Sequence, residues 1–260
     1  MNPPRRAPVS AVIITLNAER LLDKCLRSVA FCDEILVVDS GSTDRTLEIA
    51  REHGARIIHQ DWLGFGPQKR FAVEQAAHDW VLCLDADEWV SEELQASIEG
   101  FLVEPAAQAA MFPRCNRFLG RWLRHGEGYP DWSLRLFDRR HGNWSDDAVH
   151  ERVIARGNIV RLQGDLMHES QETLHEYLEK QNRYTTLQAR ALAEAGKRAS
   201  VSRLLFSPAF RFLRLYLFRL GFMDGVPGLV HVTIGSMNTA IKYMKLMELN
   251  HASDEHRPAR

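Results

Sequence analysis

The chain has 260 residues, of which 45% are hydrophobic and 26% are charged, the proportions of a globular protein that buries a real core. This length suits one large domain, or one domain with an appendage. The formal net charge is only −1, which excludes a general attraction for nucleic acid and leaves room for local basic patches alone.

Short apolar runs alternate with amphipathic segments through the first hundred residues. The apolar runs predict buried strands at residues 11–16, 34–38, 56–59 and 80–84. Helices are expected between them. Asn17 would cap the first helix, Thr43 or Asp44 the second, and Pro67 lies in the first turn of the third. This alternation predicts a Rossmann-like α/β fold, with a mostly parallel sheet flanked by helices on both faces.

The strand–helix rhythm ends near residue 105. Short β-like pieces follow at residues 110–112, 134–138, 151–154 and 159–166, and a long helical pattern covers residues 173–195. We therefore expect an α/β part at residues 9–170 and a helical C-terminal appendage at residues 171–250. The four cysteines form no CxxC pair, which favours reduced structural thiols, and residues 1–10 lack the apolar core of a secretory signal.

The C-terminal appendage contains a basic, amphipathic helix. Ser207 and Pro208 are expected to open it, as N-cap and first-turn residue, and Gly221 to close it. Arginines gather toward one side of the helical wheel and large apolar residues occupy much of the rest: Arg203, Arg211, Arg214 and Arg219, against Phe210, Leu213, Leu217 and Leu220. The helix is too short and too charged to cross a bilayer. We expect it to lie at a membrane surface, with packing against its own domain or a dimer partner as the alternative.

Polar and acidic residues follow the ends of three predicted strands. They are Thr15, Asn17, Asp39, Asp85 and Asp87. In an open α/β sheet, ligands bind at the carboxyl ends of the strands, so these segments are expected to converge on one crevice. Asp85 and Asp87 are two residues apart, which places both carboxylates on one face of an extended strand. Such a pair suits Mg²⁺ or Mn²⁺, although solvated turns and helix caps share the pattern.

Together these segments resemble a known family. In order along the chain, AVIITLNAE, EILVVDSGSTDRT, GFGPQKR and WVLCLDADE are similar to the glycosyltransferases of family 2, which have the GT-A fold. The likeness is good over residues 9–100 and looser beyond them. The later segments GYPDWSLRLFDRRHGNW, VHERV and GDLMHES resemble the lipopolysaccharide-core β-glucosyltransferase branch of that family.

The resemblance implies roles for individual residues. Those that would bind the nucleotide sugar are Thr15, Asn17, Asp39, Lys69 and Asp85. Asp39 would contact the base, Lys69 the base or the diphosphate, and Asp85 the ribose or the metal. Asp87 and His168 would bind the divalent ion. Without the resemblance, Lys69 reads as a solvated charge and His168 as a structural histidine.

The resemblance also implies an inverting transfer, in which a carboxylate takes the proton of the attacking hydroxyl. Glu151, within His150-Glu151, is the first candidate for this base, Asp131 the second and the pair Asp146/Asp147 the third. A surface strand residue is the alternative interpretation of Glu151. The aromatic residues that are candidates for stacking on a sugar are Trp122, Tyr129, Trp132 and Trp144.

The expected function is therefore a metal-dependent, inverting glycosyltransferase that moves a hexose, with UDP-glucose as the first candidate donor, to a hydroxyl of a lipid-linked glycan such as lipopolysaccharide core. It would act at the inner face of the cytoplasmic membrane, without nucleic acid and with an oligomer possible. Transfer to polyprenyl phosphate, nucleotide-sugar synthesis by a nucleotidyltransferase and a non-catalytic regulatory module on a doubly wound sheet are the alternatives.

Overall fold

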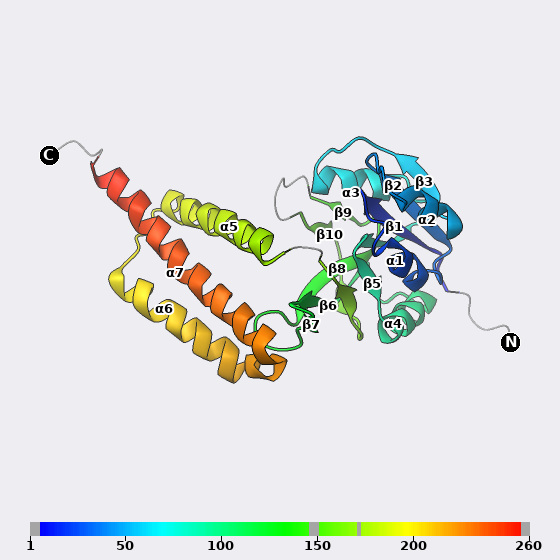
Figure 1. The fold of residues 1–260 in the computed structure, drawn as a ribbon. Coiled ribbons are helices and arrows are strands. Elements are labelled where there is room, and N and C mark those ends of the chain that lie inside the picture. The colour runs from blue at the N-terminus through cyan, green and yellow to red at the C-terminus, as the bar shows by residue number, and fades with distance from the viewer. Residues whose placement is uncertain (1–5, 146–150, 171–172, 256–260) are drawn as a thin grey trace. The chain divides into compact units, whose positions relative to one another are not determined.

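A computed structural model describes residues 6–145, 151–170 and 173–255 of the chain (Figure 1). The chain divides into two compact units. Unit 1 consists of Met1–Cys115 and Asp131–Glu169, and unit 2 of Asn116–Pro130 and Ser170–Arg260. Unit 1 holds the sheet and unit 2 the long helices.

Residues 116–130 belong to unit 2, whereas the sequence pattern assigns them to the α/β part. Hydrogen bonds of their backbone groups explain why they belong to unit 2. The Asp224 carboxylate accepts the N–H groups of Arg124 and His125 at 3.0 and 2.8 Å, and the N–H of Gly126 donates to the Arg219 carbonyl at 2.8 Å. Because buried backbone donors require partners, these bonds tie the segment to the helical unit.

The main sheet has the strand order β3-β2-β1-β4-β8-β6-β12-β5. Its parallel part consists of β1 (Val9–Thr15), β2 (Glu34–Asp39), β3 (Arg56–His59) and β4 (Trp80–Asp85). The remainder consists of β5 (Glu88–Val90), β6 (Ala109–Phe118), β8 (Asp131–Asp138) and β12 (Leu166–His168). The pairs β4–β8, β8–β6 and β12–β5 are antiparallel. The α/β fold is confirmed, and its sheet is mixed, with the predicted parallel order in its first four strands.

Short strands lie outside this order. β7 (Arg121–Trp122) and β11 (Ile159–Arg161) both pair with β6. β9 (Gly142–Trp144) and β10 (Val153–Ala155) form a separate antiparallel pair.

Helices cover both faces of the parallel strands. They are α1 (Leu22–Ser28), α2 (Thr46–Glu52), α3 (Phe65–Glu74) and α4 (Glu92–Val103). Side chains of β1 alternate between the faces: Ala11 and Ile13 join a core with α1 and α4, and Val12 joins a second core with α3. Because both faces are buried, the strand is almost wholly apolar.

Strand register sets the position of the polar residues at the strand ends. Thr15 on β1 pairs with Asp39 on β2, and Ile14 on β1 pairs with Asp85 on β4. Since β1 lies between β2 and β4, the carboxyl ends of all three strands are neighbours. Thr15, Asp39 and Asp85 therefore lie along one edge of the sheet.

The expected cap at Asn17 is wrong. Helix α1 begins at Leu22, and Asn17 adopts a left-handed conformation with φ of +50°. An N-cap residue needs an extended backbone, whereas asparagine tolerates the left-handed region that this turn requires. Asp44 accepts the N–H of Thr46, the first residue of α2, at 2.9 Å, so it satisfies one of the free donors at that helix start.

Unit 2 is built from α5 (Leu174–Glu194), α6 (Val201–Leu213) and α7 (Gly225–Glu255). A π-helical turn, η1 (Arg214–Phe218), and a 3-10 turn, η2 (Gly221–Asp224), connect α6 to α7. Helix α7 packs against both α5 and α6 (Figure 1). Among the residues that the structure describes, no helix combines the length and apolarity that a bilayer crossing requires.

Helix α6 begins earlier than the sequence predicts. Ser200, rather than Ser207, is its N-cap, and the Ser200 hydroxyl accepts the N–H of Arg203 at 3.3 Å. Pro208 lies inside the helix. An internal proline removes one helical hydrogen bond, yet α6 continues through Pro208 and packs against α7. The predicted start at Ser207 and Pro208 is therefore wrong.

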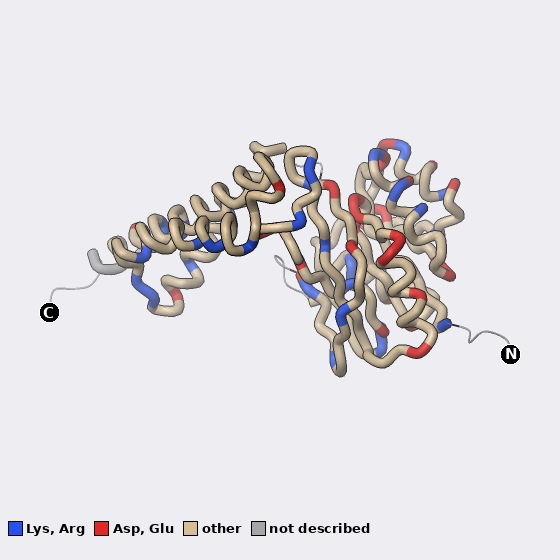
Figure 2. The backbone as a smooth tube through the Cα atoms, turned by 90° about the horizontal axis from the view of Figure 1, so that it is seen from below, with Lys and Arg blue, Asp and Glu red and all other residues tan. Residues whose placement is uncertain are grey.

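The two units carry opposite charge (Figure 2). Unit 2 contains 16 of the 33 Lys and Arg residues but 9 of the 34 Asp and Glu residues, a formal net charge of +7. Unit 1 contains the other 17 basic and 25 acidic residues, a formal net charge of −8. The near-zero net charge of the whole chain is thus the sum of a negative unit 1 and a positive unit 2, each of which favours partners of the opposite charge.

Gly228 allows α7 to approach the turn before it. A Cβ at this position would lie 2.3 Å from the Gly221 carbonyl oxygen and 2.7 Å from Cβ of Asp224. We expect Gly228→Ala to lower the free energy of unfolding by about 2 kcal/mol, because backbone atoms must move to admit the methyl group. The matched control is Gly100→Ala in α4, where nothing lies within 4 Å and the change should stabilise by roughly 0.5–1 kcal/mol. Thermal unfolding followed by circular dichroism measures both, and an unchanged Gly228→Ala variant would contradict this packing.

Candidate active site

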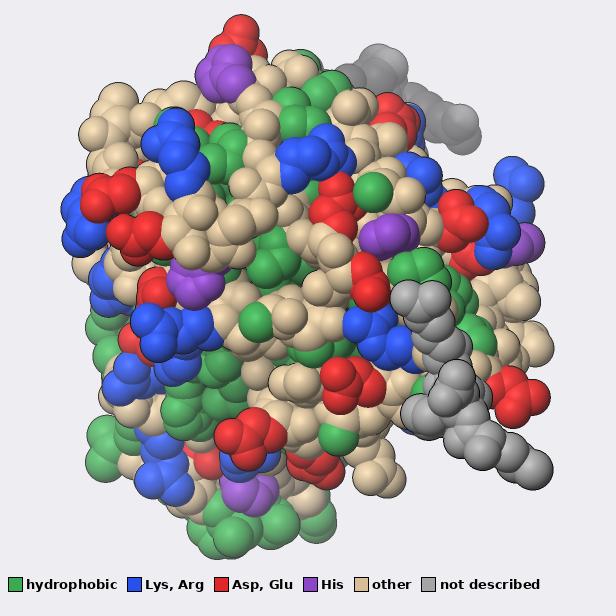
Figure 3. Space-filling model, turned by 90° about the vertical axis from the view of Figure 1, so that its right-hand side faces the viewer, with side chains coloured by type: hydrophobic (Ala, Val, Ile, Leu, Met, Phe, Trp, Pro, Cys, Tyr) green, Lys and Arg blue, Asp and Glu red, His purple; other side chains and the backbone are tan. Residues whose placement is uncertain are grey.

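The surface alone does not locate a functional site. On the face drawn in Figure 3, acidic, basic and histidine side chains are interspersed, without a field of one sign. Buried charges are more informative, because a charge removed from water requires a partner. Several such charges lie at the carboxyl ends of the parallel strands.

Asp39 ends β2, and hydrogen bonds occupy its carboxylate. Oδ1 accepts the hydroxyls of Thr15 at 2.9 Å and of Ser42 at 2.5 Å. Oδ2 accepts the N–H groups of Gly41 at 2.9 Å and of Ser42 at 2.8 Å. Burial raises the pKa of Asp39, but the hydrogen bonds from Ser42, Gly41 and Thr15 outweigh it and hold the pKa below its ordinary value. An ionised carboxylate therefore anchors the loop after β2 to the end of β1.

Asn17 joins the loop after β1 to the same structure. Its N–H donates to the Ser42 hydroxyl at 2.9 Å, and its side-chain oxygen accepts the N–H of Thr43 at 2.9 Å. Asn17 thus holds two strand-end loops together, beside Thr15 and Asp39.

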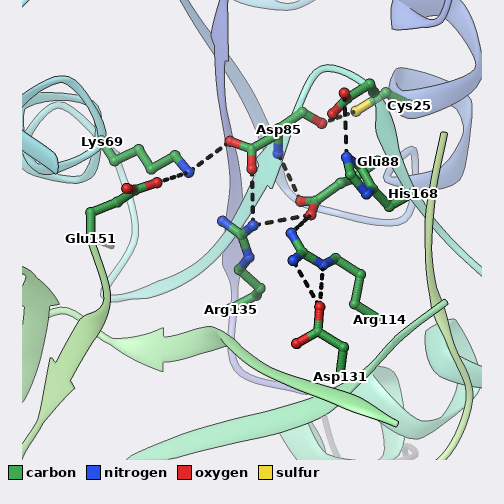
Figure 4. Close-up of polar contacts among 10 residues, drawn as sticks. Cys25, Lys69, Asp85, Glu88, Arg114, Asp131, Arg135, Glu151 and His168 are labelled. Atoms are coloured by element: carbon green, nitrogen blue, oxygen red, sulfur yellow. Dashed lines mark hydrogen bonds and ion pairs between the residues drawn. The ribbon is translucent and has the colours of Figure 1, made fainter. Parts of the chain in front are cut away.

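Asp85 ends β4 between two buried cations (Figure 4). Its Oδ1 lies 2.8 Å from Nζ of Lys69 on α3, and its Oδ2 lies 2.9 Å from a guanidinium nitrogen of Arg135 on β8. Lys69 also donates to Oε1 of Glu151 at 3.1 Å. Burial raises the pKa of Asp85, but Lys69 and Arg135 outweigh it and hold the pKa far below its ordinary value. The structure therefore brings Lys69, Asp85 and Glu151 together.

Glu88 begins β5, is completely buried and connects further charges to this group. Its Oε1 lies 3.0 Å from Arg135 and 3.4 Å from Arg114, while its Oε2 accepts the N–H of Asp85 at 3.0 Å. Arg114 donates to Oδ2 of Asp131 through two nitrogens, at 2.9 and 2.8 Å. Asp131 thus forms an ion pair with Arg114. Successive ion pairs from Arg114 to Glu88, from Glu88 to Arg135 and from Arg135 to Asp85 connect it to the end of β4 (Figure 4).

Asp87 and His168 form a pair of possible metal ligands. Oδ2 of Asp87 lies 3.4 Å from Nε2 of His168, and their side chains are 32% and 21% exposed. Within the described ranges, no group of three or more histidine, cysteine or acidic side chains is suitably placed to hold a metal ion. Two ligands suit Mg²⁺ or Mn²⁺, which take one or two protein carboxylates together with substrate phosphates and water. The donor set therefore fits a divalent ion that arrives with a phosphorylated ligand.

Sequence reasoning missed Arg135 and Glu88. Both are buried, at 6% and 0% exposure, and Arg135 forms ion pairs with Glu88 and with Asp85. A signal existed in β8: an arginine in the apolar run of residues 134–137 must find an acidic partner if the strand is buried. The sequence does not identify that partner, because Asp85 and Glu88 lie 50 and 47 residues away.

The remaining predicted residues are the other candidates for the base and the aromatic residues for stacking on a sugar. Asp146, Asp147 and His150 lie outside the described residues. Trp144 is buried at 4% exposure, with Lys69 and Arg135 against its ring, so it does not offer a face to a sugar. The remaining candidates for stacking are Trp122, Tyr129 and Trp132, of which Trp132 is exposed at 37% with Arg161 over its ring.

Arg135→Leu tests the buried charge group. Asp85 would keep Lys69 and Glu88 would keep Arg114, but one buried positive charge between the two carboxylates is lost. We expect the free energy of unfolding to fall by about 3 kcal/mol in urea denaturation at neutral pH. The matched control is Arg27→Leu, which removes an exposed ion pair with Asp23 and should leave stability nearly unchanged. Equal effects of the two substitutions would contradict the assigned importance of the buried group.

The sequence and the fold of the chain are similar to those of known proteins. The sequence matches the family described as Glycosyl transferase family 2 over residues 10–161. It is 33% identical to the lipopolysaccharide core biosynthesis glycosyltransferase LpsC of Rhizobium meliloti, over 94% of this chain and 93% of the relative. An uncharacterized glycosyltransferase of Rickettsia typhi is 31% identical, over 93% of this chain and 87% of its own. The solved mannosyltransferase PcManGT of Pyrobaculum calidifontis, in complex with GDP-Man and Mn²⁺, is 16% identical and shares the fold, with a TM-score of 0.53 over 94% of this chain and 88% of its own. On this evidence the chain has the GT-A fold and belongs to glycosyltransferase family 2.

Proposed function

We propose that the protein is a metal-dependent, inverting glycosyltransferase that moves a hexose from a nucleotide diphosphate sugar to a hydroxyl of a lipid-linked glycan such as lipopolysaccharide core. UDP-glucose is the first candidate donor. The observation that carries the proposal is the grouping after β4: Asp87, two residues after the ion-paired Asp85, lies 3.4 Å from His168, and His168 pairs with Glu88 in the sheet. The name of the Rhizobium meliloti relative supports the acceptor class. Membership of a glycosyltransferase family argues against the two alternatives of another class, a nucleotidyltransferase and a regulatory module.

The nucleoside of the donor would lie over the ends of β1 and β2. Thr15 and Asn17 would line this pocket, and Asp39 would contact the base. A carboxylate has about four acceptor positions, and Thr15, Ser42 and Gly41 already use four on Asp39. A base N–H that binds Asp39 would therefore replace the Ser42 hydroxyl.

Asp87 and His168 would hold the divalent ion, and the diphosphate of the donor would complete its coordination. Held there, the ion would supply Lewis-acid neutralisation of the charge that the diphosphate gains on leaving. The chain positions its two ligands through the backbone: the N–H of Glu169, next to His168, donates to the Asp87 carbonyl at 3.1 Å. The Mn²⁺ in the Pyrobaculum calidifontis complex supports an ion of this class.

Glu151 is the base that we propose. Lys69 holds it beside Asp85, whereas Arg114 engages the alternative base, Asp131, through two nitrogens. The acceptor hydroxyl gives its proton to Glu151 while its oxygen bonds to the anomeric carbon. The bond from that carbon to the diphosphate breaks on the opposite face, so a single displacement inverts the anomeric centre. Lys69 acts here as a positioning residue for both carboxylates.

A lipid-linked acceptor requires the enzyme to work at a bilayer. We therefore propose a peripheral protein at the inner face of the cytoplasmic membrane, where a soluble nucleotide sugar meets the acceptor. The same site chemistry would serve a polyprenyl phosphate acceptor, so an acceptor panel has to distinguish the two.

A transfer assay tests the proposal. Purified protein, a UDP-, GDP- and dTDP-sugar panel and a lipid-linked core acceptor should give nucleotide release that EDTA suppresses, with a β-linked product from an α-linked donor. We expect Glu151→Gln to lower kcat by roughly 10²–10⁴-fold, because the general base is lost. Asp131→Asn is the matched variant and should retain far more activity.

Two results would contradict these assignments. Full turnover in Glu151→Gln with loss in Asp131→Asn would transfer the role of base to Asp131. Retention of the anomeric configuration in the product would exclude a single displacement altogether.

A further inference from the structure

Unit 2 exposes a strip of large apolar side chains. Helix α6 has 13 residues, and none of them is buried. The most exposed members of α6 and of the segment after it define what we call the apolar strip: Phe218 (82%), Phe206 (71%), Val226 (71%), Phe210 (67%), Val201 (62%) and Leu205 (61%). Exposed apolar surface of this extent marks an interaction site rather than ordinary surface.

Helix α6 is apolar on two sides. Leu204 and Pro208, four residues apart, are half-buried members of the helix, which packs against α7. Phe206 and Phe210, also four residues apart, fall on a different side and are exposed. A helix that packs against one neighbour alone normally carries polar residues on its outer side. The outer side of α6 therefore has the composition of a second contact surface.

Arginine accompanies the apolar strip. Residues 201–224 contain Arg203, Arg211, Arg214 and Arg219, and their one acidic residue, Asp224, is buried. Arg203 and Arg214 are exposed. Phenylalanine beside arginine suits the boundary between lipid headgroups and acyl chains, where apolar rings insert and guanidinium groups meet phosphates. A second copy of this chain would bring another unit of charge +7 to the same surface, and that repulsion opposes self-association.

We infer that α6, η1 and η2 dock on the surface of an anionic bilayer, with Phe206, Phe210 and Phe218 entering the headgroup–acyl boundary. Arg203 and Arg214 pair with lipid phosphates there. The inference rests on the proposed function in that a lipid-linked acceptor calls for a bilayer. Beyond the proposed function, the inference names the residues that contact the bilayer and states that they favour anionic lipids.

The test is co-sedimentation of the full chain with unilamellar vesicles, in the absence of donor and acceptor. The vesicles contain phosphatidylcholine alone, or phosphatidylcholine with about 30% phosphatidylglycerol. We expect at least about tenfold tighter binding to the anionic vesicles, weakening as salt screens the charges. Phe206→Ser/Phe210→Ser should weaken binding to them by about tenfold or more, because the inserted apolar area is lost.

Two further variants separate the contributions. Arg203→Gln/Arg214→Gln should reduce the preference for anionic vesicles and flatten the salt dependence. Ile154→Ser/Ile159→Ser is the matched control: it removes two apolar side chains from unit 1 that are exposed at 56% and 45%, and it should bind as the unaltered protein does. All these side chains are exposed, so every variant should keep its unfolding temperature.

Several results would overturn the inference. Equal binding to both kinds of vesicle would show that charge does not contribute to docking. Unchanged binding of Phe206→Ser/Phe210→Ser would show that the apolar strip is not the contact surface. A dimer in light scattering that this variant dissociates, with no vesicle binding by the unaltered chain, would assign the surface to a second copy. Vesicle binding without any sugar transfer would contradict the proposed function alone, whereas transfer to a soluble acceptor without vesicle binding would contradict the docking alone.

Discussion

Neutralisation of two neighbouring carboxylates, the buried Glu88 and the partly buried Asp85, is the constraint on which the site depends. Neither can lose water without a cation beside it. Lys69 from α3 and Arg135 from β8 satisfy Asp85, and Arg135 and Arg114 satisfy Glu88. These ion pairs connect the parallel and antiparallel parts of the sheet around one turn. Asp87, between Asp85 and Glu88 in the sequence, is partly exposed beside His168.

The first half of the fold follows from local sequence pattern, and the rest depends on distant partners. Apolar runs with amphipathic segments between them give β1 to β4 in parallel order, and the strand-end rule places Thr15, Asp39 and Asp85 along one edge. Prediction from local sequence pattern fails where a residue makes a contact with a distant part of the chain. Asn17 bridges two loops instead of capping a helix. Residues 116–130 join unit 2 through backbone bonds to Asp224 and Arg219, about a hundred positions along the chain.

Charge is the property that the whole-chain composition describes least well. A net charge of −1 is the sum of −8 in unit 1 and +7 in unit 2. The negative unit 1 repels a diphosphate, so the proposed donor requires a divalent cation or local positive charge beside it. A positive helical unit with exposed phenylalanines instead attracts an anionic surface. The charges of the two units thus suit the two partners, a nucleotide sugar and a lipid surface, that the proposed function requires.

In the proposed function, Asp87 and His168 hold a donor diphosphate through one divalent cation. Calorimetric titration of UDP into the protein, with Mn²⁺ and with EDTA, tests this without depending on the sugar, the acceptor or the base. We expect UDP binding to weaken at least about tenfold without the ion, and to weaken similarly in Asp87→Asn with the ion present. UDP that binds equally well in EDTA, or to Asp87→Asn, would contradict this assignment.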